Sequence, residues 1–302
     1  MERQSAAPTV AVVADTSGSI SREEAGKMGV VLVPVPFHIG DDLYFEEVTI
    51  SHAEFYQRSA GARCRTTQPN VADVTDVWDE VLKTHEQLVY IPMSAGLSSS
   101  YENLYMQAKT YEGRVEVINA YRVCGPMGSA IRDCVWLRDQ GRSAAEIRQA
   151  VEEIATDYSS FVMVDTLEPL KQGGRITPAA AAIATVLGIK PILTFGTGVL
   201  GAYAKVRGKK AAIACMLDAT EAELQGRLAP FAARGEMQLR ICQTNCPEEA
   251  EAFAGQVAAR FPGMDVRIDA TPLNIACHIG AGALALFCIR CIRPITKGED
   301  PQ

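Results

Sequence analysis

Short apolar runs alternate with stretches of helical periodicity through the first half of the chain. Four runs have the length and the Val/Ile/Leu content of buried strands, at 10–14, 30–35, 88–92 and 115–119. Apolar residues recur at helical spacing over 71–82 and 101–108. Ser21 and Ser143 each stand three residues before a glutamate, which is the pattern of a capping box at a helix start. Alternating strands and helices predict a parallel sheet covered by helices.

The pattern changes near residue 160. A strand is expected at 161–165 and an Ala-rich helix over 177–188. Closely spaced strands are expected next, at 191–195, 203–207 and 211–216, and further strands at 238–242 and 265–268. Two helices lie among these strands: one begins at a capping box of Thr220 and Glu223, and the other has Pro247 at its first position. Such spacing favours hairpins, so we expect a mostly antiparallel sheet here.

The predicted fold class is therefore α/β with two domains. A parallel α/β/α domain is expected over 1–160, and an α+β domain with a mostly antiparallel sheet over 161–302. The segment near 271–295 is a candidate for packing back at the domain interface.

Charge and composition narrow the class of partner. The 302 residues carry 29 Lys and Arg against 36 Asp and Glu, a net charge of −7, which argues against nucleic acid or an anionic membrane surface as the main partner. The longest apolar runs, 177–189 and 280–289, fall short of the ~18 residues that a membrane span needs, so no stable membrane insertion is expected. No export signal is visible and the nine cysteines are scattered, so we expect a cytoplasmic protein with reduced thiols.

Three polar loops follow predicted strands or lead into helices: Asp15-Thr16-Ser17-Gly18-Ser19, residues 65–69 (RTTQP) and residues 94–100 (SAGLSSS). Ligands of parallel sheets bind beyond the carboxyl ends of the strands. Hydroxyls and free amides at helix starts form a natural anion site there. Two later segments add to this set: residues 171–177 (KQGGRIT), with a cation beside two glycines, and residues 278–283 (HIGAGA).

Together, the segments ADTSGSIS, RTTQPN, MSAGLSSSY, DTLEPLKQGGRIT, KPIL, KVRGKKA and HIGAGAL carry a family resemblance. In this order and spacing they resemble the DegV family of bacterial fatty-acid-binding proteins, over essentially the whole chain. The resemblance implies two domains that hold one long-chain fatty acid, such as palmitate, stearate or oleate, between them. It implies no cofactor other than this ligand. It also implies a non-catalytic subunit that presents the carboxylate to a separate ATP-dependent fatty acid kinase, which forms an acyl-phosphate for phospholipid synthesis.

The resemblance also implies roles for particular residues. Thr66 and either Ser94 or Ser98 would hold the carboxylate, with Arg175 and His278 close behind. In the basic cluster at 205–210, Arg207, together with Lys205, would belong to the surface that meets the kinase.

The chemistry agrees with a bound acyl chain. A buried carboxylate needs several hydrogen-bond donors to stay ionised. At ~0.8 kcal/mol per buried methylene, a 16-carbon chain gains on the order of 11 kcal/mol before the costs of association. We expect the small apolar residues of 179–187 and 279–289 to line the tunnel.

Three alternatives stay open at this point. The loop at 15–19 also matches the D-x-S-x-S pattern of the metal-dependent adhesion site in von Willebrand factor A-like domains, in which an Asp and two hydroxyls bind Mg²⁺. Two cysteine pairs, Cys242 with Cys246 and Cys288 with Cys291, have the spacing to form a structural zinc site. The third alternative is an acyl-hydrolysing enzyme that uses a loop serine, although the sequence shows neither a G-x-S-x-G elbow nor a base for it.

Overall fold

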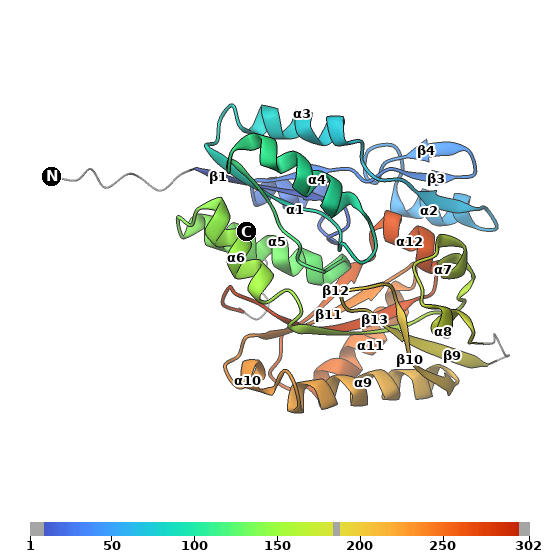
Figure 1. Cartoon of the computed structure of the whole chain (residues 1–302). Coiled ribbons are helices and arrows are strands. Elements are labelled where there is room, and N and C mark those ends of the chain that lie inside the picture. Colours follow the sequence, from blue (N-terminus) through green and yellow to red (C-terminus); the bar gives the residue numbers. More distant parts are fainter. Residues whose placement is uncertain (1–8, 184–187, 296–302) are drawn as a thin grey trace.

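A four-stranded parallel sheet forms the first half of the protein. The structure is a computed structural model that describes residues 9–183 and 188–295. The strand order is β2-β1-β6-β7 (Figure 1), and every neighbouring pair is parallel, as predicted. The strands are β1 (Val10–Asp15), β2 (Val30–Val33), β6 (Gln87–Ile91) and β7 (Val115–Val117).

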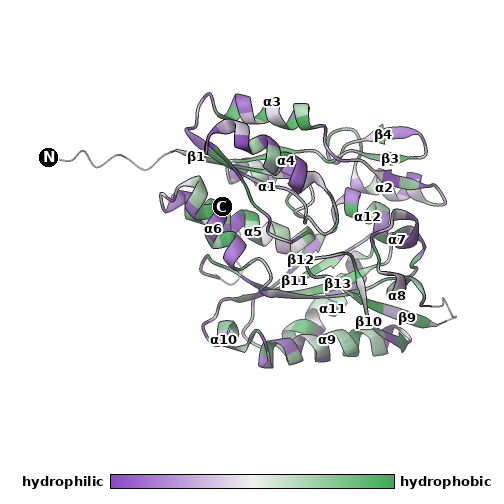
Figure 2. Ribbon diagram, in the orientation of Figure 1, coloured by the Kyte–Doolittle hydropathy of each residue, from purple (hydrophilic) through white to green (hydrophobic). Residues whose placement is uncertain are grey.

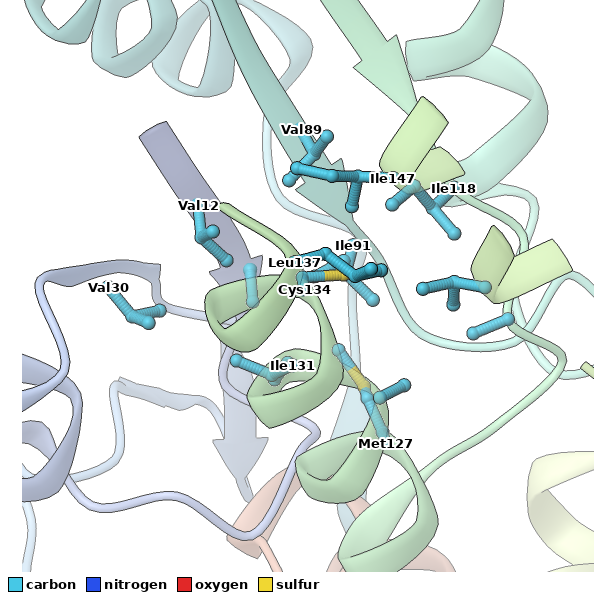
Figure 3. Close-up of a cluster of buried hydrophobic side chains, with 14 of the residues drawn as sticks. Val12, Val30, Val89, Ile91, Ile118, Met127, Ile131, Cys134, Leu137 and Ile147 are labelled. Atoms are coloured by element: carbon cyan, nitrogen blue, oxygen red, sulfur yellow. The ribbon is translucent and has the colours of Figure 1, made fainter. Parts of the chain in front are cut away.

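Helices cover both faces of this sheet. One face packs on α1 (Arg22–Lys27), α5 (Cys124–Asp139) and α6 (Ala144–Glu153), and Figure 3 shows Met127, Ile131 and Cys134 of α5 against the valines of β1 and β2. The other face packs on α3 (Val71–Val81) and α4 (Ser100–Ala108). Both Ser21 and Ser143 cap a helix, because both side chains accept from the backbone N–H three residues later. The predicted capping box is complete only at Ser143, since the Glu24 side chain pairs with Arg132 instead.

A small antiparallel sheet beside this one was not predicted. It has the order β4-β3-β5, with β3 (Phe37–Ile39), β4 (Asp42–Tyr44) and β5 (Cys64–Thr66), and α2 (His52–Ser59) packs beside it. Strands of three residues are too short to show an alternating pattern. The small sheet matters because β5 ends at Thr66.

The second half of the chain forms a six-stranded sheet of order β10-β9-β8-β13-β11-β12. Only β11 and β12 are parallel neighbours in it, so the sheet is mostly antiparallel, as predicted. Its strands are β8 (Tyr158–Met163), β9 (Ile189–Thr194), β10 (Gly201–Arg207), β11 (Met237–Gln243), β12 (Val266–Ala270) and β13 (Leu284–Arg290). The remaining helices are α7 (Glu168–Gly173), α8 (Pro178–Ala181), α9 (Lys209–Gln225), α10 (Ala229–Ala232), α11 (Pro247–Arg260) and α12 (Leu273–Ile279), and one 3-10 turn spans Lys109–Tyr111. Pro247 stands at the first position of α11, as expected.

Two local predictions in this half are wrong. The strand expected at 211–216 lies inside α9, where Ala212 and Met216, four residues apart, are buried on one face. Thr220 does not cap a helix, because it lies in the middle of α9 and its hydroxyl donates to the Met216 carbonyl at 2.9 Å. The helix expected over 177–188 is the short α8 in its described part, and residues 184–187 lie outside the described residues.

Helix α5 lies between the two larger sheets (Figure 1) and packs against strands of both. Ser129 of α5 donates to the Gln238 side chain of β11 at 2.9 Å, and Arg293 donates to Asp133 of α5 at 2.8 Å. In Figure 2, hydrophobic positions follow the strands, whereas α3, α4 and α6 carry hydrophilic positions on the outside. In the described part of the chain, every helix is too short or too polar to cross a bilayer. The domain limits at residue 160 stay a prediction.

Candidate functional site

A cavity opens on the face of the six-stranded sheet that is turned away from α9 and α11. The empty space in it is about 1110 Å³ when the solvent at its mouth is included. The sheet contributes small or medium side chains to the wall, such as Val162, Cys242 and Ala285. The sheet also contributes the larger Phe287 of β13. Further apolar wall residues come from loops and from α12: Met93, Leu97, Val123, Phe195, Leu200, Ile275, Ile279 and Ala283.

Polar side chains gather at one end of this cavity, and this end is the mouth. Thr67 and Gln68 are exposed, and Thr66, Ser98, Arg175 and His278 are partly exposed, whereas the wall residues on the sheet strands are buried. The cavity is therefore a mainly apolar chamber with a polar rim, and its wall also contains four buried polar residues, Asp15, Ser100, Thr244 and Thr271.

Thr66 and His278 meet at this rim although 212 positions separate them. Thr66 ends β5 and His278 lies in the last turn of α12, and Thr66 Oγ1 is 2.9 Å from His278 Nε2. Burial and the nearby Arg175 lower the pKa of His278 to about 4, so the ring is neutral at pH 7. Gly173 makes room for this ring, because a Cβ at that position would lie 2.3 Å from His278 Nδ1. Packing against His278 thus explains why a glycine stands at the first position of the GGRIT segment.

Arg175 is a cation at the same rim. The chain turns into it through Gly174, whose φ of 67° lies in the left-handed region that glycine favours. Its Nε donates to the Leu97 carbonyl at 3.3 Å and its Nη1 to the Gly173 carbonyl. Within residues 9–183 and 188–295, no carboxylate forms an ion pair with Arg175. A Thr hydroxyl and a guanidinium that has no carboxylate partner in the described part of the chain have the chemistry to bind an anion such as a carboxylate.

The serine-rich loop places its two candidate serines differently. Ser98 lines the cavity, and its Oγ accepts from the Ser100 N–H at 3.2 Å at the start of α4. Ser94 is buried behind the wall, where its Oγ accepts from the Gly96 N–H at 3.2 Å and shapes the turn. Gly96 permits a close approach to the β9–β10 loop, because a Cβ there would lie 2.3 Å from the Thr197 carbonyl oxygen.

Comparison with known proteins identifies the family. The family model described as "Uncharacterised protein, DegV family" matches residues 9–290. The chain belongs to the DegV family. It is 29% identical over 286 residues to DegV domain-containing protein spr1415 of Streptococcus pneumoniae, covering 92% of this chain and 97% of that protein. It is 24% identical over 290 residues to Protein DegV of Bacillus subtilis, covering 93% and 99%.

Solved structures of fatty-acid-binding proteins share the fold. A fatty-acid-binding DegV family protein from Thermus thermophilus superposes with a TM-score of 0.84 at 25% identity, covering 93% of this chain and 99% of that one. A stearic-acid-binding protein from Eubacterium ventriosum superposes with a TM-score of 0.80 at 22% identity, covering 92% and 97%.

The deep wall of the cavity in this DegV-family chain holds a buried carboxyl group. Asp15 is the last residue of β1, and its two oxygens accept from the Ser17 N–H at 2.9 Å and the Met93 N–H at 2.7 Å. Burial outweighs these bonds and raises the pKa of Asp15 to about 6. The position of Asp15 where a strand meets a loop was visible in the sequence, but its place in the cavity wall was not.

The alternative of a metal-dependent adhesion site on this loop is not favoured. Besides Asp15, Thr16 Oγ1 accepts from the Val35 N–H at 3.0 Å and Ser17 Oγ accepts from the Asn274 amide at 2.8 Å. These oxygens shape the loop and join it to α12. Among the residues that the structure describes, no three or more His, Cys, Asp and Glu side chains are grouped to hold a metal ion.

The four cysteines considered for zinc do not come together. Cys242 faces the cavity, whereas Cys288 lies in the cluster on the opposite face of the sheet, beneath α9. Cys246 donates to the Ala283 carbonyl and Cys291 to the Gln238 side chain.

One of the two segments expected to line the tunnel does so. Ile279, Ala283, Ala285 and Phe287 are wall residues, but none of residues 179–183 is, and 184–187 lie outside the described residues. Lys205 and Arg207 lie away from the cavity wall, exposed on the edge strand β10. The sequence did not predict that Phe195, Leu200 and Ile275 line the cavity, because a single apolar residue in a loop or short helix gives no signal of a cavity.

Proposed function

We propose that this protein binds one long-chain fatty acid, such as palmitate, stearate or oleate, with its acyl chain in the cavity and its carboxylate at the mouth. The observation that carries the proposal is the apolar chamber whose polar rim holds the unpaired Arg175 beside the Thr66–His278 pair. The family and the fatty-acid-binding Thermus thermophilus structure support it.

The rim and the chamber contribute differently to binding. Thr66 and Ser98 offer hydroxyls and Arg175 offers guanidinium N–H donors, so that the carboxylate stays ionised next to an apolar wall. The neutral His278 holds Thr66 in place and adds no positive charge of its own. The chamber supplies most of the affinity, at ~0.8 kcal/mol for each methylene that leaves water.

Native mass spectrometry of the protein as purified tests this proposal. We expect one bound species with the mass of a fatty acid, and palmitate uptake by protein from which lipid has been stripped. Thr66→Val and Arg175→Gln should each weaken palmitate binding roughly tenfold, about the 1.4 kcal/mol of one lost hydrogen bond. Arg63→Gln, a change at an exposed arginine outside the cavity, is the matched control. A protein that carries no acyl mass and takes up no added palmitate or oleate would refute the proposal.

The second part of the proposal concerns a partner. The protein acts as a non-catalytic subunit, and a separate cytoplasmic ATP-dependent fatty acid kinase transfers a phosphoryl group to the presented carboxylate, yielding acyl-phosphate and ADP. A carboxylate at the mouth is within reach of such a partner. Lys205 and Arg207 offer a positive surface on β10, where the intervening Val206 packs inward and leaves them exposed.

Arg207→Ala separates presentation from binding. We expect it to leave palmitate affinity unchanged and to lower acyl-phosphate formation by the kinase, with Arg63→Ala as the control. If Arg207→Ala weakens palmitate binding as much as Arg175→Gln does, the assignment of β10 to the kinase surface is wrong.

A further inference from the structure

Two cysteines lie next to the residues that form the rim. Cys64 begins β5, two residues before Thr66, and Cys277 directly precedes His278 in α12. Helix α12 packs against β5, and both cysteines belong to the apolar cluster formed there with Phe37. The two thiols lie beside one another in this cluster and interact with each other. Strand β5 and helix α12 therefore meet at two places: at the Cys64–Cys277 pair, and at the Thr66–His278 hydrogen bond beside it at the mouth.

The two thiols are not equivalent. Cys64 is partly exposed, whereas Cys277 is buried. The interaction with Cys277 lowers the pKa of Cys64, while the same interaction and burial raise the pKa of Cys277. An accessible thiol of lowered pKa beside a second thiol is the arrangement of an oxidisable cysteine with its resolving partner.

We propose that Cys64 and Cys277 form a reversible disulfide when the protein meets a hydroperoxide such as hydrogen peroxide, and that this disulfide holds the mouth of the cavity shut. The Cys64 thiolate attacks one peroxide oxygen, which gives a Cys64 sulfenic acid and hydroxide. The sulfur of Cys277 then attacks the sulfenic sulfur, the S–S bond forms, and the released hydroxyl leaves as water. In total, two thiols and one hydrogen peroxide give one disulfide and two waters.

The position of the pair links it to the proposed ligand, and this part rests on the proposed function. Thr66, Thr67 and Gln68 follow Cys64 along one side of the mouth, and His278 and Ile279 follow Cys277 along the other. In the proposed binding mode, an acyl chain that enters or leaves passes the rim to which both of these sides belong. A covalent bond from β5 to α12 restrains their separation, so it slows acyl exchange.

A second cysteine pair in the same protein provides an internal comparison. Cys124 and Cys242 both line the cavity and are both buried, and Cys242 Sγ accepts from the Gly125 N–H at 3.4 Å. Contact with Cys242 and burial raise the pKa of Cys124 well above its usual value. An oxidant reaches this pair only through the chamber, and a bound acyl chain fills that route. We therefore expect Cys64 and Cys277 to oxidise first.

Peptide mapping of the full-length protein tests the disulfide. After treatment with hydrogen peroxide and blocking of the remaining thiols, we expect a mass loss of two hydrogens and a cross-linked peptide that joins Cys64 to Cys277. Dithiothreitol should reverse both. Cys64→Ser and Cys277→Ala should each abolish the cross-link, and Cys215→Ser, at a partly exposed thiol on α9, should leave it intact. A disulfide that joins Cys124 to Cys242 first, or no disulfide at all, would overturn the proposal.

Exchange of radiolabelled palmitate tests the effect on the mouth. We expect the oxidised protein to release palmitate several-fold more slowly than the reduced protein, and Cys64→Ser to show no change on peroxide treatment. Equal release rates in a protein whose disulfide has been mapped would refute the closure of the mouth. If neither form binds palmitate, the proposed function fails while the mapped disulfide stands, so the two failures are distinguishable.

Discussion

The two faces of the six-stranded sheet are built from neighbouring residues of the same strands, yet one is filled and the other holds a cavity. Toward α9 and α11, the strands present large side chains that are fully packed, among them Phe161, Met163, Ile241, Leu284 and Leu286. Toward α5 and the cavity, the same strands present the smaller Val162, Cys242 and Ala285, together with the large Phe287. Because side chains alternate along a strand, one of two adjacent residues packs under the helices and the other faces the cavity.

This difference separates the residues that stabilise the fold from those that leave room for the proposed ligand. Large side chains on the packed face remove apolar surface from water when the chain folds. Small side chains on the cavity face leave unfilled space, which costs stability until a ligand fills it. Ala285 and Leu286, adjacent in β13, represent the two faces and allow the comparison to be tested.

The largest effect is expected from Leu286→Ala. Leu286 is fully buried, and replacing such a leucine costs about 2–5 kcal/mol of unfolding free energy. Urea unfolding of the ligand-free protein measures this loss. Palmitate affinity of the folded variant should stay within about twofold of the parent, less than 0.5 kcal/mol. A variant that keeps its stability and loses palmitate would reverse the roles assigned to the two faces.

Ala285→Leu should show the opposite behaviour. The added carbons occupy chamber space, and if they displace about three methylenes of the ligand the loss is ~2 kcal/mol, a fall of more than tenfold in palmitate affinity. Isothermal titration with palmitate measures it, and the unfolding free energy of the ligand-free protein should change by less than about 1 kcal/mol. Strong destabilisation by overpacking would contradict the presence of free space beside Ala285.

A smaller effect distinguishes two titratable groups in the cavity wall. The pKa of His278 is lowered from 6.5 to about 4, so between these values the unfolded chain binds a proton that the folded chain does not, and acidification destabilises the protein. The pKa of Asp15 is raised from 3.8 to about 6, so the folded chain binds the extra proton and acidification stabilises it. The two contributions oppose one another.

Thermal unfolding at pH 7 and pH 5 separates them. We compare the change in unfolding free energy from pH 7 to pH 5 with that of the parent. This change should be about 1–2 kcal/mol more favourable for His278→Gln and less favourable by about as much for Asp15→Asn. His85→Gln, at a surface histidine outside the cavity, is the control. Equal pH responses in all four proteins would show that neither group keeps its shifted pKa.

Local features of the fold were predictable, and the failures share one cause. The caps at Ser21 and Ser143 and the strand at β1 depend on residues within a few positions of each other, so their patterns are complete in the sequence. The run at 211–216 is apolar enough for a strand, but it lies within the longer helix α9, whose side chains at 212 and 216 pack onto the sheet. Short apolar runs do not distinguish the two structures, and tertiary packing decides between them.

The sequence was enough to predict which segments form the candidate site, but not how their side chains are placed relative to one another. Polar loops after strands, the GGRIT segment and the late histidine mark out Thr66, Arg175 and His278, and all three lie at the rim. The choice between Ser94 and Ser98 was open in the sequence. The structure distinguishes them, because one hydroxyl closes a turn behind the wall and the other lies in it.

Composition, periodicity and motif order are enough to indicate the parallel and antiparallel halves, the acidic charge and the family resemblance. The folded chain is needed to show that Thr66 meets His278 across 212 positions, that Cys64 lies beside Cys277, and that Asp15 is buried in the chamber wall. Such contacts depend on how the small sheet, α12 and the six-stranded sheet pack together. The small side chains of β8, β11 and β13 become a cavity only when that packing leaves their face unfilled.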